Sequence, residues 1–95
     1  MTHAEAKAAL LAIVDGVKRQ RDLERTLYGG PGCLVERVFG LVERDDPDGF
    51  IPYRRPDYDA CLAVGIAPER VWGASDAYVN GIITKEELRA KIEAL

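Results

Sequence analysis

The sequence predicts a small all-α domain, and three observations lead to that prediction. A chain of 95 residues with 47% hydrophobic and 31% charged residues has the length and composition of one globular domain. Apolar residues recur with helical spacing, and no segment shows a clear strand pattern. Capping boxes, in which Thr precedes Glu by three residues, stand near both ends. We therefore expect one domain over residues 1–95, a bundle of about five helices with a long loop at 45–55.

The first helix is predicted to begin behind Thr2, because the Thr2 hydroxyl and the Glu5 carboxylate can each satisfy a free main-chain N–H. Its apolar residues share one stripe: Leu10, Ile13, Val14 and Val17, continuing through Leu23 and Leu27. Gly16 weakens its middle by about 1 kcal/mol relative to alanine. We expect the glycines and proline of residues 29–32 to end the helix.

Residues 33–44, "CLVERVFGLVER", are predicted to form the second helix, although their β-branched residues favour a strand. The apolar positions wrap one helical face: 34, 35, 38, 39, 41 and 42. A chain this short gains core by pairing, which makes a homodimer plausible, and this helix would carry the contact surface if its face is not already covered. Its contact surface would be a strip of three residues: Leu34, Val38 and Leu41.

Three shorter helices are predicted in the second half, with Pro or Thr at the start. They comprise residues 56–64 before Gly65, residues 68–79 before Asn80-Gly81, and a last helix from Thr84. The final two resemble a helix-turn-helix hairpin. Trp72 is predicted to plug the core.

The stretch "DAYVNGIITKEEL" allows three interpretations: a calcium loop, a DNA-reading turn or a helix boundary. Six residues fit positions of the EF-hand calcium loop: Asp76, Asn80, Gly81, Ile83, Thr84 and Glu87. This resemblance fails at the third position, where Tyr78 replaces one of the 6–8 oxygen ligands that calcium takes. A DNA-reading helix here would face phosphates with three carboxylates: Glu86, Glu87 and Glu93. We favour a helix boundary, which uses each of these residues as a stop or cap.

Residues 78–95, "YVNGIITKEELRAKIEAL", also resemble the short C-terminal domain family known as SHOCT. That family ends in a helix, a Gly-Ile-Ile-Thr-like turn and a final charged helix. The resemblance implies an appendage that mediates association.

Side chains for catalysis or metal binding are sparse. His3 is the one histidine and lies at a fraying end, and Cys33 and Cys61 form no Cys-x-x-Cys pair. We expect two free, buried thiols in a reducing cytoplasm, with one disulfide as the alternative. The N-terminus lacks signal-peptide features, and the run "AALLAIV" is too short for a membrane span. The sequence therefore predicts a soluble cytoplasmic protein with no enzymatic activity, cofactor or metal.

The loop "GFIPYRRPDYDA" is the segment that most favours partner binding. Five aromatic and arginine residues form the candidate site: Phe50, Tyr53, Arg54, Arg55 and Tyr58. Tyr and Arg dominate binding hot spots, and prolines reduce the entropy lost when a loop docks. In the alternative, the rings close the core and the arginines pair with aspartates.

These observations favour a non-enzymatic protein-binding domain: an adaptor, an assembly subunit or a compact inhibitor of the kind carried by mobile elements. The alternative is a nucleic-acid-binding regulator that uses the C-terminal helix pair or the basic run 18–25. A net charge of −3 weakens that alternative. In the run, i,i+4 spacing also predicts intrahelical ion pairs, Asp15 with Arg19 and Lys18 with Asp22.

Overall fold

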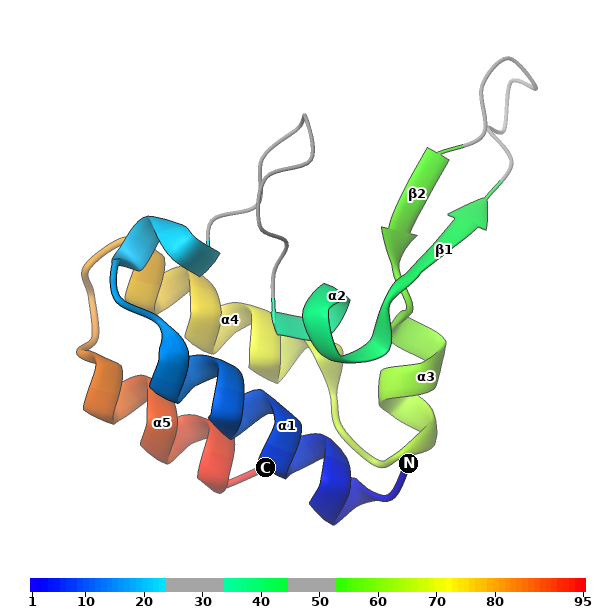
Figure 1. Cartoon of the computed structure of the whole chain (residues 1–95), viewed down its shortest axis with the longest axis horizontal. Coiled ribbons are helices and arrows are strands. Elements are labelled where there is room, and N and C mark those ends of the chain that lie inside the picture. The colour runs from blue at the N-terminus through cyan, green and yellow to red at the C-terminus, as the bar shows by residue number, and fades with distance from the viewer. Residues whose placement is uncertain (24–33, 45–52) are drawn as a thin grey trace.

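The computed structural model describes residues 1–23, 34–44 and 53–95 (Figure 1). These residues form five α-helices, one 3-10 turn and one two-stranded sheet: α1 (His3–Gly16), η1 (Gln20–Leu23), α2 (Leu34–Phe39), β1 (Leu41–Arg44), β2 (Tyr53–Pro56), α3 (Tyr58–Ala63), α4 (Pro68–Val79) and α5 (Lys85–Glu93). The predicted all-α class with about five helices is confirmed. Within the described ranges, no helix has the length and apolar character needed to cross a membrane.

The capping box that begins α1 is confirmed. Thr2 Oγ1 accepts the Glu5 main-chain N–H at 3.1 Å, and Glu5 Oε1 accepts the Thr2 main-chain N–H at 2.9 Å. One face of the helix is buried at Ala6, Leu10 and Val14, which have the i,i+4 spacing of a single stripe.

The predicted extension of α1 to residue 27 is wrong, because the helix ends at Gly16. Asp22 Oδ2 instead accepts the main-chain N–H groups of Lys18 at 3.2 Å and Arg19 at 2.9 Å, which holds a turn. Arg19 pairs with Asp22 at 3.8 Å, and Asp15 pairs with Arg89 of α5. The two predicted i,i+4 ion pairs are therefore replaced by this i,i+3 pair and by a contact between helices.

The prediction of one helix over residues 33–44 is also wrong in its second half. Gly40 adopts a φ of 82°, a conformation that favours glycine, and the chain leaves the helix there. The Gly40 N–H closes α2 by donating to the Glu36 carbonyl at 2.8 Å. β1 then pairs antiparallel with β2, so that Leu41 lies opposite Pro56 and Arg44 lies opposite Tyr53.

The helix boundaries in the last third of the chain agree with the sequence. α4 has Pro68 in its first turn and Asn80 as its C-cap, and Gly81 follows with a φ of 74°. Thr84 caps α5 in a second capping box with Glu87. The boundary of α3 differs slightly, because Pro56 belongs to β2 and the carboxylate of Asp57 caps the helix at the Ala60 N–H, 3.0 Å away.

The core lies where α1, α4 and α5 meet α2. α1 and α5 lie side by side and antiparallel, with α4 packed along α5 (Figure 1). Large side chains from four segments are fully buried here: Leu10, Leu34, Ile66, Leu88 and Ile92.

Two predictions about exposed and buried apolar residues are corrected by this packing. Leu34 is fully buried and Val38 packs against the core, so the predicted homodimer strip is largely covered by the chain's own helices. Trp72 is 48% exposed and does not plug the core. The buried face of α4 carries Val71 and Tyr78, and Trp72 lies about 100° away from Val71 around the helix.

Candidate partner-binding surfaces

The β1–β2 hairpin extends away from the helices (Figure 1). It carries most of the residues that the sequence predicts to bind a partner, since Tyr53, Arg54 and Arg55 form β2 and Tyr58 begins α3. Phe50 lies outside the described residues. The candidate site therefore lies on a projecting element and at its junction with α3.

Arg55 and Tyr58 lie together at the base of this hairpin. The guanidinium carbon of Arg55 is 5.7 Å from the centroid of the Tyr58 ring, a cation–π contact. Both residues are half-buried, and the Arg55 Nε is buried without a hydrogen-bond acceptor in the described part of the chain. The pair thus stiffens the point where the hairpin joins the helices.

The outer edge of β1 has main-chain groups that point away from its partner strand. The Asp57 N–H donates to the Gly40 carbonyl at 3.0 Å, and this bond determines which residue pairs of the antiparallel ladder are hydrogen-bonded. Because hydrogen-bonded and non-hydrogen-bonded pairs alternate, the N–H and C=O groups of Leu41 and Glu43 point outward. In Figure 1 this edge faces away from the helices, and Leu41 is 44% exposed.

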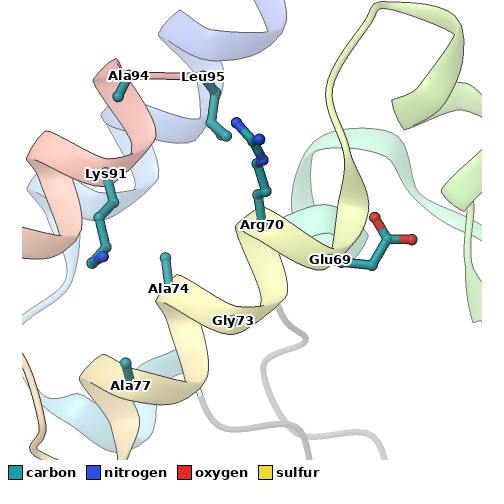
Figure 2. Close-up of a pocket in the computed structure, with 8 residues that line it drawn as sticks. All are labelled: Glu69, Arg70, Gly73, Ala74, Ala77, Lys91, Ala94 and Leu95. Atoms are coloured by element: carbon teal, nitrogen blue, oxygen red, sulfur yellow. The ribbon is translucent and has the colours of Figure 1, made fainter.

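A second surface lies between α4 and α5, where a cavity of about 380 Å³ opens (Figure 2). Its lining combines small residues and one leucine with charged residues: Glu69, Arg70, Gly73, Ala74, Ala77, Lys91, Ala94 and Leu95. Figure 2 shows Arg70 and Lys91 on opposite sides of Ala74, and Glu69 directed away from α5. We call this surface the α4–α5 groove.

Arg70 and Lys91 are the cations of this groove. Both are exposed, and neither makes an ion pair or side-chain hydrogen bond within residues 1–23, 34–44 and 53–95. Arg89, two residues before Lys91 on α5, instead pairs with Asp15 at 3.0 Å and with Glu93. The groove therefore carries two cations that form no ion pair within the described fold, beside one carboxylate, Glu69.

Sequence reasoning missed the α4–α5 groove, although it located both helices. The residues that form its floor are glycine and alanine, which carry no chemical signal of their own. Gly73 in the middle of a predicted helix was the available clue, because an interior glycine weakens a helix and calls for an explanation.

No known family, curated protein or solved structure matches the chain. Its function is therefore inferred from these two surfaces. The resemblance of residues 78–95 to the SHOCT family stays a prediction.

The residues that fit a calcium loop are used differently in the structure. Glu87 Oε1 accepts the Thr84 N–H at 3.1 Å, and Thr84 Oγ1 accepts the Glu87 N–H at 3.2 Å. Asn80 ends α4. The described residues contain no group of three or more His, Cys, Asp or Glu side chains placed to hold a metal ion.

Cys61 is a buried free thiol, as the sequence predicts, whereas Cys33 lies outside the described residues. The Cys61 Sγ donates to the Ile66 carbonyl at 3.4 Å. Burial, and secondarily the charge of Glu69, raise the pKa of Cys61 to about 11. The thiolate form is therefore scarce at neutral pH, and this cysteine is structural.

Proposed function

We propose that this chain is a non-enzymatic protein-binding domain that pairs the outer edge of β1 with an extended segment of another protein. The outward direction of the Leu41 and Glu43 main-chain groups supports the proposal, because an extended segment laid along this edge can hydrogen-bond with an outward-facing strand edge. An isolated two-stranded hairpin is marginal in water, so a third strand would also stabilise it.

The residues at the base of the hairpin suit the same role. The Arg55–Tyr58 pair combines an aromatic ring with a guanidinium, and these groups dominate binding hot spots. Leu41 adds an exposed apolar side chain beside the edge. Such a domain would act as an adaptor, an assembly subunit or a compact inhibitor of another cytoplasmic protein.

Glu43→Pro tests the proposal most directly. Proline removes an outward N–H and leaves the inward ladder hydrogen bonds of Val42 and Arg44 in place, so the variant should fold and lose its partner. Glu43→Gln removes the charge alone and should keep the partner. Val42→Pro removes an inward N–H and should disrupt the hairpin. The measurement is quantitative mass spectrometry of proteins retained from the native host by each tagged variant.

A single protein that is lost with Glu43→Pro and kept with Glu43→Gln would support edge pairing. If Glu43→Pro folds and retains the same proteins as the original chain, edge pairing is wrong. Amide NMR spectra of the purified variants show whether the fold survives.

The arginines of β2 provide a second test. Arg54→Ala combined with Arg55→Ala should weaken retention of the partner while the thermal unfolding midpoint stays close to that of the original chain. Tyr58→Phe keeps the ring under Arg55 and serves as the matched control. A double variant that unfolds, or that retains its partner normally, would assign these arginines a structural role.

The nucleic-acid alternative would use the α4–α5 pair or the run 18–25. A mobility shift with duplex DNA that falls steeply with salt concentration would favour it over the protein-binding proposal.

A further inference from the structure

Gly73 lies in the interior of α4, and the described fold gives no reason for a glycine there. Its φ is not positive, so its backbone conformation suits any residue. A Cβ at this position would meet no atom within 4 Å. An interior glycine weakens a helix by about 1 kcal/mol relative to alanine. A glycine at this exposed position leaves room for the close approach of another backbone.

The surroundings of Gly73 extend this flat surface. Ala74 and Ala77 lie beside it on α4, and Ala94, the C-cap of α5, also lines the groove. Small side chains on two adjacent helices let a third helix approach within the 8–10 Å at which packed helices lie. The groove thus fits a helix with a stripe of small or medium apolar residues.

The charges at the groove indicate the chemistry of that helix. Arg70 stands on the α4 side and Lys91 on the α5 side, and both lack partners in the described part of the chain. Glu69 points away from α5 and forms no ion pair with either cation in the described part of the chain. A helix seated between Arg70 and Lys91 would place carboxylates against both.

We propose that the α4–α5 groove binds an acidic amphipathic helix of a partner protein, with carboxylates on both flanks of its apolar stripe. This surface is separate from the β1 edge, so the inference does not depend on strand pairing. Binding uses the apolar floor for contact area and the two cations for orientation and specificity.

Synthetic peptides provide the probe. One is a helix-favouring peptide with an Ala/Leu stripe flanked by glutamates, and the other carries lysine at each glutamate position. Each is titrated into the full chain in about 50 mM salt, where surface charges are weakly screened. The readouts are the fluorescence of Trp72, which is half-exposed next to Gly73, and the amide NMR shifts of α4 and α5.

The acidic peptide should bind and shift the amides of Gly73, Ala77 and Lys91, whereas the lysine peptide should not. Its affinity should fall as salt rises, because the two cations contribute to binding. Equal binding of the two peptides, binding of neither, or shifts confined to other elements would overturn the proposal.

Gly73→Leu fills the groove and should weaken binding of the acidic peptide by about tenfold or more. Gly16→Leu is the matched control, because Gly16 is also helical and a Cβ there meets no atom within 4 Å. It should leave peptide binding unchanged. If Gly73→Leu is folded by NMR and binds as tightly as the original chain, the groove is not the docking surface.

Charge reversal tests specificity independently of the glycine. The combined variant Arg70→Glu and Lys91→Glu should lose the acidic peptide and bind the lysine peptide instead. Its stability should stay close to that of the original chain, because neither residue has a described intramolecular partner. Unchanged peptide preference would contradict the proposal.

Glu43→Pro separates the two proposals. It should leave peptide binding at the groove intact, because β1 and the α4–α5 groove share no residue. Loss of peptide binding in this variant would show that the groove is not an independent site.

Discussion

The ammonium group of Lys85 lies 2.8 Å from the main-chain carbonyl oxygen of Val17, the C-cap residue of α1. It also donates to the Asp15 carbonyl at 3.1 Å. The last turn of α1 has no basic residue of its own, so the first residue of α5 supplies the positive charge that a helix C-terminus favours. At the other end of the pair, Lys7 Nζ donates to the Glu93 carbonyl at 2.8 Å. Each helix thus supplies a lysine that donates to the C-terminal carbonyls of the other.

Lys85→Met should lower the free energy of unfolding by about 1–2 kcal/mol, because it leaves two carbonyls without a charged donor while keeping the apolar stem. Urea denaturation measures the change. Lys18→Met is the control, since Lys18 donates to Asp22 through its main-chain N–H, and it should change stability by less than about 0.5 kcal/mol. Equal effects of the two variants would show that Lys85 does not stabilise the α1–α5 pair.

Thr84→Ala should destabilise the domain by about 1 kcal/mol, because the hydroxyl that accepts the Glu87 N–H is lost. Thr84→Ser keeps that oxygen and should retain most of the stability. Thermal unfolding followed by circular dichroism distinguishes them. If both substitutions have the same effect, the threonine methyl rather than the cap is responsible.

The stability that Glu5 provides should depend on pH. Hydrogen bonds from the main chain and then the side chain of Thr2 hold the pKa of Glu5 below its ordinary value. The unfolded chain therefore takes up this proton first as pH falls. The contribution should be complete above about pH 4.3, the ordinary glutamate value, and disappear as pH falls through the lower folded pKa.

Urea unfolding of the original chain and of Glu5→Gln, from about pH 6 down to pH 3, tests this dependence. The stability difference between the two should change through this acid range in the stated direction. A difference that stays constant would show that the Glu5 carboxylate does not titrate differently in the folded chain.

Cys61 should resist thiol reagents while the domain is folded. Because burial raises its pKa to about 11, little thiolate forms at about pH 8, near the ordinary cysteine value of about 8.5. In a Cys33→Ser variant, a chromogenic disulfide reagent should react slowly in buffer and rapidly in denaturant. Equal rates in both conditions would contradict the burial of the thiol.

The same shift predicts an alkaline loss of stability. The unfolded thiol ionises first, so the contribution of neutral Cys61 is complete below about pH 8.5 and is lost as pH rises through the folded pKa of about 11. Cys61→Ala should lack this part of the alkaline decline in a urea titration.

Helix ends could be predicted from the sequence where the signals act over a few residues. Pro68, Asn80-Gly81 and Thr84 were sufficient to place α4 and the start of α5, because prolines, glycines and capping side chains act on their own turn of backbone. The end of α1 was predicted wrongly, because the apolar stripe of the sequence continues past Gly16, where the helix ends.

The candidate surfaces were accessible to sequence reasoning to different degrees. Composition pointed to the arginines and tyrosines of residues 53–58, and the structure brings Arg55 and Tyr58 together. The α4–α5 groove could be recognised only from the packing of the two helices, because glycine and alanine in a sequence do not indicate which surface they form.

The sequence alone determined the helical class, both capping boxes and the boundaries of α4, since each depends on contacts within one helical turn. The tertiary structure decided that residues 41–44 are a strand, because their hydrogen-bond partners lie at 53–56. It also decided that Trp72 faces outward and that Lys85 closes α1. Strand pairing, burial and contacts between helices all join residues that lie far apart in the chain, so a pattern of neighbouring residues does not predict them.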